Sequence, residues 1–365
     1  MKPSPVLLAF LALVACKITP KSAEQSDTTV ATPAGSAARP ATADSVVAGV
    51  SPGAGADSIT PTDSGVVTLH PSLPRRGGVL FVMVQGVTTD PPRCTWKSSV
   101  VPCYRVEGGV RALIPLPADE PAGPYTLTIE RPGGRITRQV TVADREFERE
   151  LVFLDSARYA LLAATSNIGR DARALRQVLS TESAEQRWSG AWRDPVEGGG
   201  RSSAHGVERF YFRASDSARA VTLPPAARVR GAFASDTGFA VGEQAPGWRH
   251  SGVDIAARRG AAVRASAAGL VTDASEYTLT GRTVVLDHGQ GVHSAYFHLD
   301  TILVRRGEVV RQGALLGRVG ETGLTTGPHL HYGVYLHGRD VDPVAWRDMP
   351  EFARRGGAGA ERAAR

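Results

Sequence analysis

The histidines of this chain are concentrated in one region. Seven of the nine fall between His250 and His337. The pair His329 and His331 precedes an alternating apolar run, and in a strand two side chains spaced this way project from the same face, about 6–7 Å apart. One such imidazole can bind a metal ion while its neighbour reaches a water molecule beside the ion.

A second motif adds a carboxylate to these imidazoles. The stretch His250-Ser251-Gly252-Val253-Asp254 lies on a glycine-containing loop that enters a predicted strand. Two imidazole nitrogens and one carboxylate oxygen, with a fourth position open, are the ligand count of a catalytic zinc, whereas a structural zinc is normally closed by four ligands. Imidazole ligands also favour zinc over magnesium. Each motif alone is weak, so the prediction of a zinc site depends on their combination.

Several motifs occur in the order typical of one enzyme family. The stretches His250–Asp254, Ala295–Leu299, Gly327–His331 and Val341–Pro343 resemble the lysostaphin/LytM-type zinc endopeptidases, which cut peptidoglycan cross-links. The resemblance implies that His250, Asp254 and His331 are the zinc ligands. It also implies that His298 and His329 flank the attacking water as the catalytic histidines, without assigning the general base to either.

One departure from the family pattern concerns the start of the catalytic domain. The family usually opens this domain with a Ser-x-Phe-Gly-x-Arg-like strand a few residues before the first ligand. Ser203–Arg209 resembles that opening, with His205 in place of Phe, but a long segment separates it from His250. Alternatively, Arg230-Gly231-Ala232-Phe233 begins the domain. In either case, residues 209–248 are expected to rim the substrate groove.

The elements that must position these residues are predicted to be mainly strands. Short apolar runs broken by Gly and Pro predict a mainly β protein. Residues 76–145 are predicted to form a small immunoglobulin-like β-sandwich, because Pro121–Ile129 is similar to the final hairpin of such modules. Apolar residues three to four apart predict a helical connector over 146–194. The catalytic domain is placed at 195–347, as an antiparallel β domain of the duplicated-hybrid-motif type that the resemblance implies, and a flexible tail at 348–365.

The N-terminus has the pattern of an exported lipoprotein. Residues 1–15 form a charged start and an apolar segment of signal-peptide length. Leu13-Val14-Ala15-Cys16 resembles the lipobox of bacterial lipoproteins, which implies lipidation of Cys16 and a membrane anchor. The expected location is the outer membrane, facing the periplasm; a plain signal peptide that happens to end in cysteine is the alternative. Residues 16–75 have almost no large apolar side chains and are predicted to be a disordered tether.

With Cys16 assigned to lipid, two cysteines remain. Cys94 and Cys103 form an even pair in an oxidising compartment, which predicts a disulfide.

Composition excludes some classes of function. Of the 42 basic residues only four are lysines, and the arginines are scattered along a chain of net charge +6, which argues against a nucleic-acid groove. Beyond the N-terminus no apolar run approaches the ~20 residues of a membrane-spanning helix. We expect a zinc endopeptidase acting on peptidoglycan, with cell-envelope regulatory proteins as candidate partners. The alternative is an inert wall-binding regulator that activates a separate amidase.

Overall fold

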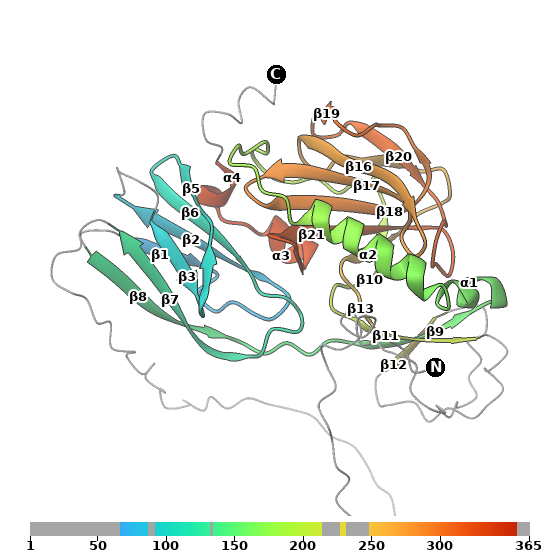
Figure 1. Ribbon diagram of the computed structural model, residues 1–365, viewed down its shortest axis with the longest axis horizontal. Coiled ribbons are helices and arrows are strands. Elements are labelled where there is room, and N and C mark those ends of the chain that lie inside the picture. The colour runs from blue at the N-terminus through green and yellow to red at the C-terminus, as the bar shows by residue number, and fades with distance from the viewer. Residues whose placement is uncertain (1–65, 87–91, 132–133, 214–226, 231–247, 356–365) are drawn as a thin grey trace, which may run out of the picture. The chain divides into compact units, whose positions relative to one another are not determined.

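The computed structural model describes residues 66–86, 92–131, 134–213, 227–230 and 248–355. These residues form four β-sheets and a few helices (Figure 1), which confirms the mainly β class. The described part of the chain contains no helix with the length and apolar character needed to cross a membrane.

Two of the sheets form a sandwich near the N-terminal side of the described chain. The first sheet contains, in order, β1 (Val67–His70), β2 (Val79–Gln85), β6 (Gly109–Pro115) and β5 (Cys103–Val106). The second contains β4 (Ser99–Val101), β3 (Arg93–Trp96), β7 (Gly123–Arg131) and β8 (Gly134–Val142). Alternate residues of β2, such as Leu80 and Val82, pack against Leu127 and Ile129 of the opposite sheet. The intervening residues, including Phe81, face the other way into a second core, so β2 is apolar at nearly every position.

The first strand begins inside the segment predicted to be a tether. The prediction of disorder over 16–75 was wrong for Val67–His70, which pair with Val84–Phe81 of β2. A strand this short carries too few apolar residues to stand out from a polar background. It is stabilised by hydrogen bonds to a neighbouring strand that local composition does not reveal.

The largest sheet is antiparallel and contains the histidine-rich region. Its strands follow the order β10 (Gly200–Ser203), β14 (Val253–Ala256), β21 (His329–Leu336), β18 (Val292–Ile302), β17 (Gly281–Gly289), β16 (Gly269–Tyr277) and β19 (Val309–Val310), with β15 (Ala262–Arg264), β20 (Leu315–Val319) and β22 (Arg339–Val341) attached at the sides. Strands β21 and β18 lie at its centre and are buried along most of their length.

A smaller sheet is formed by strands from residues 149–249, which follow the sandwich in the sequence. It contains β12 (Ala227–Arg230), β9 (Arg149–Leu154), β11 (Glu208–Arg213) and β13 (Trp248–Arg249), with β9 parallel to β11. The predicted helical connector over 146–194 was therefore wrong at its start, because β9 is an apolar strand buried by its neighbours. The helices α1 (Ser156–Leu161) and α2 (Thr165–Leu179) follow it.

Helix α2 covers one face of the large sheet, as Figure 1 shows. Its Leu175, Val178 and Leu179 pack against Val285 and Phe297 of the sheet. The apolar spacing of three and four residues on α2 matches this one-sided contact.

The smaller sheet contains strands from both candidate openings of the catalytic domain. Glu208 and Arg209 of β11 pair with Arg249 and Trp248 of β13, directly before His250. Ser203–Arg209 is therefore adjacent in space to the first predicted ligand, although it is distant in sequence. In the alternative opening, Arg230 ends β12 and the following three residues lie outside the described ranges.

The core of the large sheet extends past both predicted boundaries of the catalytic domain. Trp188 and Trp192, from the predicted connector, are buried in it. On the C-terminal side, α3 (Pro343–Arg347) and α4 (Glu351–Arg354) follow β22, and Met349 and Ala353 are buried in the same cluster. The predicted flexible tail was thus wrong for residues 348–354, which contribute apolar side chains to this core.

A buried arginine joins the sandwich to the large sheet. Arg111 of β6 is fully buried and donates to the side-chain oxygens of Gln186 and Gln290 and to the carbonyl of Ala353. Its guanidinium also lies 5.0 Å from the ring of Trp188. Burial lowers the pKa of Arg111 to about 9.

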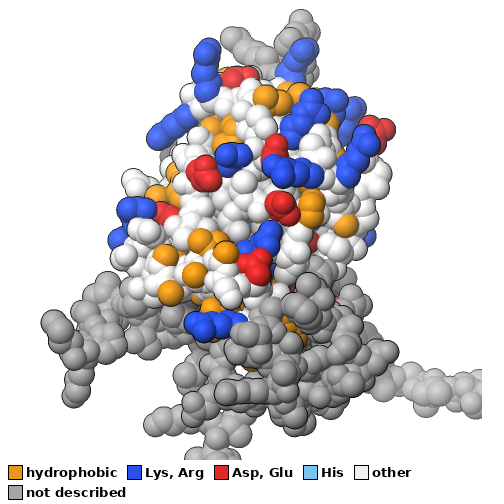
Figure 2. All heavy atoms as spheres, turned by 90° about the vertical axis from the view of Figure 1, so that its right-hand side faces the viewer, with side chains coloured by type: hydrophobic (Ala, Val, Ile, Leu, Met, Phe, Trp, Pro, Cys, Tyr) orange, Lys and Arg blue, Asp and Glu red, His pale blue; other side chains and the backbone are white. Residues whose placement is uncertain are grey.

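Charged side chains are dispersed on the face drawn in Figure 2, where Lys and Arg lie among acidic and apolar residues. Surface ion pairs such as that of Arg259 with Asp300, at 2.5 Å, contribute little to stability.

The turn between β17 and β18 yields a stability test. Gly289 has φ +87°, and a Cβ there would overlap the carbonyl oxygen of Glu185, whereas Gly307 has φ +88° with nothing within 4 Å. We expect Gly307→Ala to lower the free energy of unfolding by about 1 kcal/mol, the cost of left-handed backbone. Gly289→Ala should lower it by about 3 kcal/mol, because steric overlap adds to that cost. Denaturant unfolding followed by tryptophan fluorescence measures both, and equal losses would contradict the close approach.

Candidate metal centre

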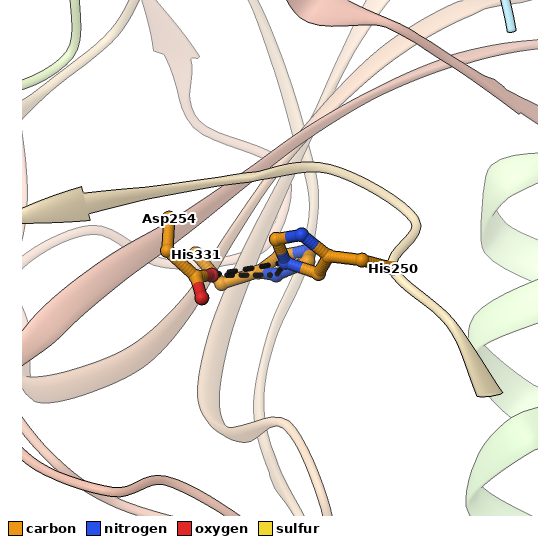
Figure 3. A group of neighbouring side chains, drawn as sticks. All are labelled: His250, Asp254 and His331. Carbon is orange, nitrogen blue, oxygen red and sulfur yellow. Dashed lines mark hydrogen bonds and ion pairs between the residues drawn. The ribbon is translucent and has the colours of Figure 1, made fainter. Parts of the chain in front are cut away.

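Three of the predicted ligands meet in the structure. His250 follows β13, Asp254 lies in β14 and His331 in the adjacent β21, where Asp254 and His331 are register partners. Figure 3 shows the three side chains pointing toward one another. Nε2 of His250 lies 3.0 Å from Oδ1 of Asp254 and 2.8 Å from Nδ1 of His331. Oδ1 of Asp254 and Nδ1 of His331 are 3.3 Å apart. They are the only group of this kind among the described residues.

These distances fit a bound cation. Nδ1 of His250 donates to the carbonyl of Ala204 at 2.8 Å, so in the neutral ring Nε2 carries a lone pair. Lone pairs of nitrogen and carboxylate oxygen repel one another at this separation unless a proton or a cation lies between them. Ligands of a tetrahedral ion with bonds of ~2.1 Å are ~3.4 Å apart, close to the observed values.

Packing holds the ligands in place. A Cβ at Gly252 would overlap the carbonyl oxygen of Tyr332 and lie 2.7 Å from Nε2 of His331, so only glycine fits at this position between His250 and Asp254. On the other side, the ring of Phe297 stacks on His331 with centroids 4.9 Å apart.

The electrostatic environment favours the metal-binding forms of these groups. Burial lowers the pKa of His250, and it lowers the pKa of His331 to about 4, so both rings are neutral near pH 7. Burial acts to raise the pKa of Asp254, but His250 and Arg209 outweigh it and hold that pKa well below its usual range. Neutral imidazoles and an ionised carboxylate are the forms that bind a metal.

The two predicted catalytic histidines lie beside this group. Nδ1 of His329 donates to the carbonyl of Gly327 at 2.8 Å, and its Nε2 is 3.6 Å from Oδ1 of Asp254. Nδ1 of His298 donates to the carbonyl of Thr322 at 2.9 Å. The rings of His298 and His329 are 5.0 Å apart, and burial followed by repulsion from neighbouring imidazoles holds the pKa of His298 well below its usual range. Both histidines therefore present a lone pair on Nε2 when neutral.

The backbone of His298 is unusual. It has φ +62°, in the left-handed region that is costly for residues other than glycine. The register of β18 against β17 shifts here, since Tyr296 pairs with Val284 while Leu299 pairs with Arg282. A bulge of this kind redirects a side chain, and here it accompanies a ring close to His329.

A cleft beside the metal centre has a wall formed by the smaller sheet. It is lined by Val152 and Leu154 of β9, Arg209 and Tyr211 of β11, and the loop Leu324–Thr326. Arg209 and Tyr211 of this cleft belong to the segment 209–248 that was predicted to rim the substrate groove, while 214–226 and 231–247 lie outside the described ranges. None of the sequence motifs indicated that β9 lines this cleft.

The remaining predicted residues lie elsewhere. Cys94 and Cys103 are bonded as a disulfide in the sandwich, with Cα atoms 6.5 Å apart. Cys16 lies outside the described residues. His288, which follows the pattern of a turn residue, is fully buried, and its Nδ1 donates to the carbonyl of Ala268 at 2.7 Å.

Known proteins share this region of the chain. Residues 248–343 match the family described as Peptidase family M23. The chain is 43% identical over 99 residues to the DD-carboxypeptidase/endopeptidase Mpg of Neisseria meningitidis, covering 27% of this chain and 23% of that protein. It is 40% identical over 95 residues to the peptidoglycan DD-endopeptidase ShyA of Vibrio cholerae, covering 26% and 22%. The matched stretch thus spans less than a quarter of these curated relatives.

A solved structure is similar over a longer stretch. The crystal structure of a putative peptidase M23 from Pseudomonas aeruginosa aligns with a TM-score of 0.52 at 27% identity. The alignment covers 75% of this chain and 95% of that one, so the likeness includes parts of the fold outside residues 248–343.

Removing single side chains distinguishes the predicted metal ligands from the predicted catalytic histidines. Asp254→Ala removes a ligand oxygen, and we expect it to lose stoichiometric Zn²⁺ in equilibrium dialysis. His329→Ala should retain the ion, because its Nε2 lies beside the ligand set and is not required to complete it. Equal loss of metal in both variants would make His329 a ligand.

Proposed function

We propose, from the premise that residues 248–343 match peptidase family M23, that this protein is a zinc-dependent endopeptidase. Its proposed substrates are amide bonds in the stem peptides or cross-bridges of peptidoglycan. The observation that carries this proposal is the convergence of His250, Asp254 and His331, with His298 and His329 beside them. The names of the relatives, a DD-carboxypeptidase/endopeptidase in Neisseria and a peptidoglycan DD-endopeptidase in Vibrio, support the choice of substrate.

The chemistry divides between the ion and the two neighbouring histidines. Zinc held by His250, Asp254 and His331 would supply Lewis acidity to polarise a carbonyl and lower the pKa of a water molecule. Nδ1 of His298 and of His329 is bonded to a backbone carbonyl, which leaves a lone pair on Nε2 of each neutral ring. One ring would accept the proton of the attacking water at Nε2 and, as an imidazolium, pass it to the leaving amine. The other would donate to the developing oxyanion only with a proton of its own on Nε2.

Digestion of purified sacculi tests the proposed activity. We expect the full-length protein to release new amino groups from sacculi, and a chelator to abolish this release. His329→Ala should reduce it about 10²- to 10⁴-fold, the usual contribution of a general acid or base. His337→Ala is the matched control, because this histidine bonds Glu182 outside the metal centre. Absence of chelator-sensitive amines from the unchanged protein would refute the proposal.

We also propose that the protein is anchored in the cell envelope through a lipid on Cys16, with peptidoglycan as its macromolecular partner. The lipobox-like Leu13–Cys16 and the polar stretch that follows support this location. Two or more acyl chains are needed for stable anchoring, and lipobox cysteines carry them.

Detergent partitioning checks the anchor. The unchanged protein expressed in bacteria should enter the detergent phase of a Triton X-114 separation, and Cys16→Ser should remain in the aqueous phase. Identical partitioning of the two would exclude lipidation at this cysteine.

A further inference from the structure

The two oxygens of Asp254 face different partners. Oδ1 faces the histidines, 3.0 Å from Nε2 of His250 and 3.3 Å from Nδ1 of His331. Oδ2 accepts a hydrogen bond of 2.5 Å from the guanidinium of Arg209. Asp254 is almost fully buried, so this contact is shielded from solvent. The side of the carboxylate turned away from the metal centre is thus occupied by a charged donor.

A second carboxylate holds Arg209 in this position. Nε of Arg209 donates to Oε2 of Glu150 at 3.0 Å, and the hydroxyl of Ser203 donates to Oε1 at 3.1 Å. The side chain of Glu150 is fully buried and that of Arg209 is 14% exposed. A guanidinium fixed between two buried carboxylates has little freedom to move, because the planar group meets both through separate nitrogens.

Strand pairing explains this arrangement. Arg209 of β11 and Glu150 of β9 are register partners in the smaller sheet. Glu150 lies outside residues 248–343, the stretch that matches the peptidase family. Support for the metal centre therefore comes from the chain segment between the sandwich and the matched domain.

We propose that Arg209, held by Glu150, is a positioning residue that reserves Oδ2 of Asp254 for itself and leaves Oδ1 to bind the metal. A carboxylate with both oxygens available can bind a cation through two atoms. At a centre with three protein ligands, a second oxygen would occupy the position that a catalytic zinc keeps open. The inference extends the proposed function by naming residues that keep this position open.

The same two strands provide a matched control. The neighbouring register partners Arg149 and Glu208 also form an ion pair, at 3.4 Å, but their side chains are 53% and 31% exposed. Arg149→Met thus removes a guanidinium from the same pair of strands without touching Asp254. Arg209→Met likewise keeps the aliphatic part of the side chain and removes the guanidinium.

The test uses the full-length protein loaded with Co²⁺ in place of zinc. The visible absorption of Co²⁺ weakens as its coordination number rises from four to five. We expect a weaker, shifted spectrum for Arg209→Met and an unchanged one for Arg149→Met. At saturating zinc, kcat of Arg209→Met should fall about 10- to 100-fold, the usual effect of changing a partner of a metal ligand, with a smaller change in KM.

A Co²⁺ spectrum of Arg209→Met that superimposes on that of the unchanged protein would overturn the inference. Should Arg209→Met fail to fold, judged by circular dichroism, two variants replace it. Arg209→Lys keeps a positive charge that can still donate to Oδ2 of Asp254, so an unchanged spectrum is expected for it. The double variant Arg209→Met with Glu150→Gln also removes the buried charge that Arg209 neutralises, and it is then the one whose unchanged spectrum would overturn the inference. The spectrum needs no substrate. A changed spectrum in a protein that never cleaves sacculi would uphold the positioning role and reject the peptidase.

Discussion

The structure must hold three polar atoms of buried side chains within 3.3 Å of one another. Nε2 of the neutral His250 ring and Oδ1 of Asp254 both carry lone pairs, and Nδ1 of His331 lies 2.8 Å and 3.3 Å from them, so a proton or a cation is needed among the three. Strand pairing between β14 and β21 fixes two of them, and the loop before β14 brings in the third. The tight approach at Gly252 and the ring of Phe297 limit how far they can relax. The candidate metal centre is therefore a property of the sheet as much as of the three side chains.

Backbone carbonyls determine which nitrogen of each ring is available. Those of Ala204, Thr322 and Gly327 accept from Nδ1 of His250, His298 and His329 respectively. A carbonyl can only accept, so in each neutral ring the proton lies on Nδ1 and the lone pair on Nε2. Loops distant in sequence thereby set the tautomers on which the proposed metal binding and proton transfer depend.

The sequence was sufficient where side-chain type and local period determine the result. The alternation in His329-Leu330-His331 correctly predicted two rings on one face, and the mainly β class followed from short apolar runs. The sequence was insufficient where segments that are distant along the chain meet in the fold. The left-handed backbone of His298 arises at a register shift between strands, and the bond from Arg209 to Asp254 depends on β9, which was predicted as part of a helical connector. The same reason explains β1 and residues 348–354, whose order depends on partners far along the chain.

The buried guanidinium of Arg111 imposes an order on assembly. During synthesis the sandwich emerges before Gln186, Gln290 and Ala353, the three residues whose oxygens accept from that guanidinium. Until they arrive, the outward face of β2 and β6, with Phe81 and Leu113, remains uncovered and the cation remains hydrated. The nascent sandwich is therefore only one part of a larger hydrophobic core. Chains truncated before Ala353 would expose apolar surface that chaperones and proteases recognise.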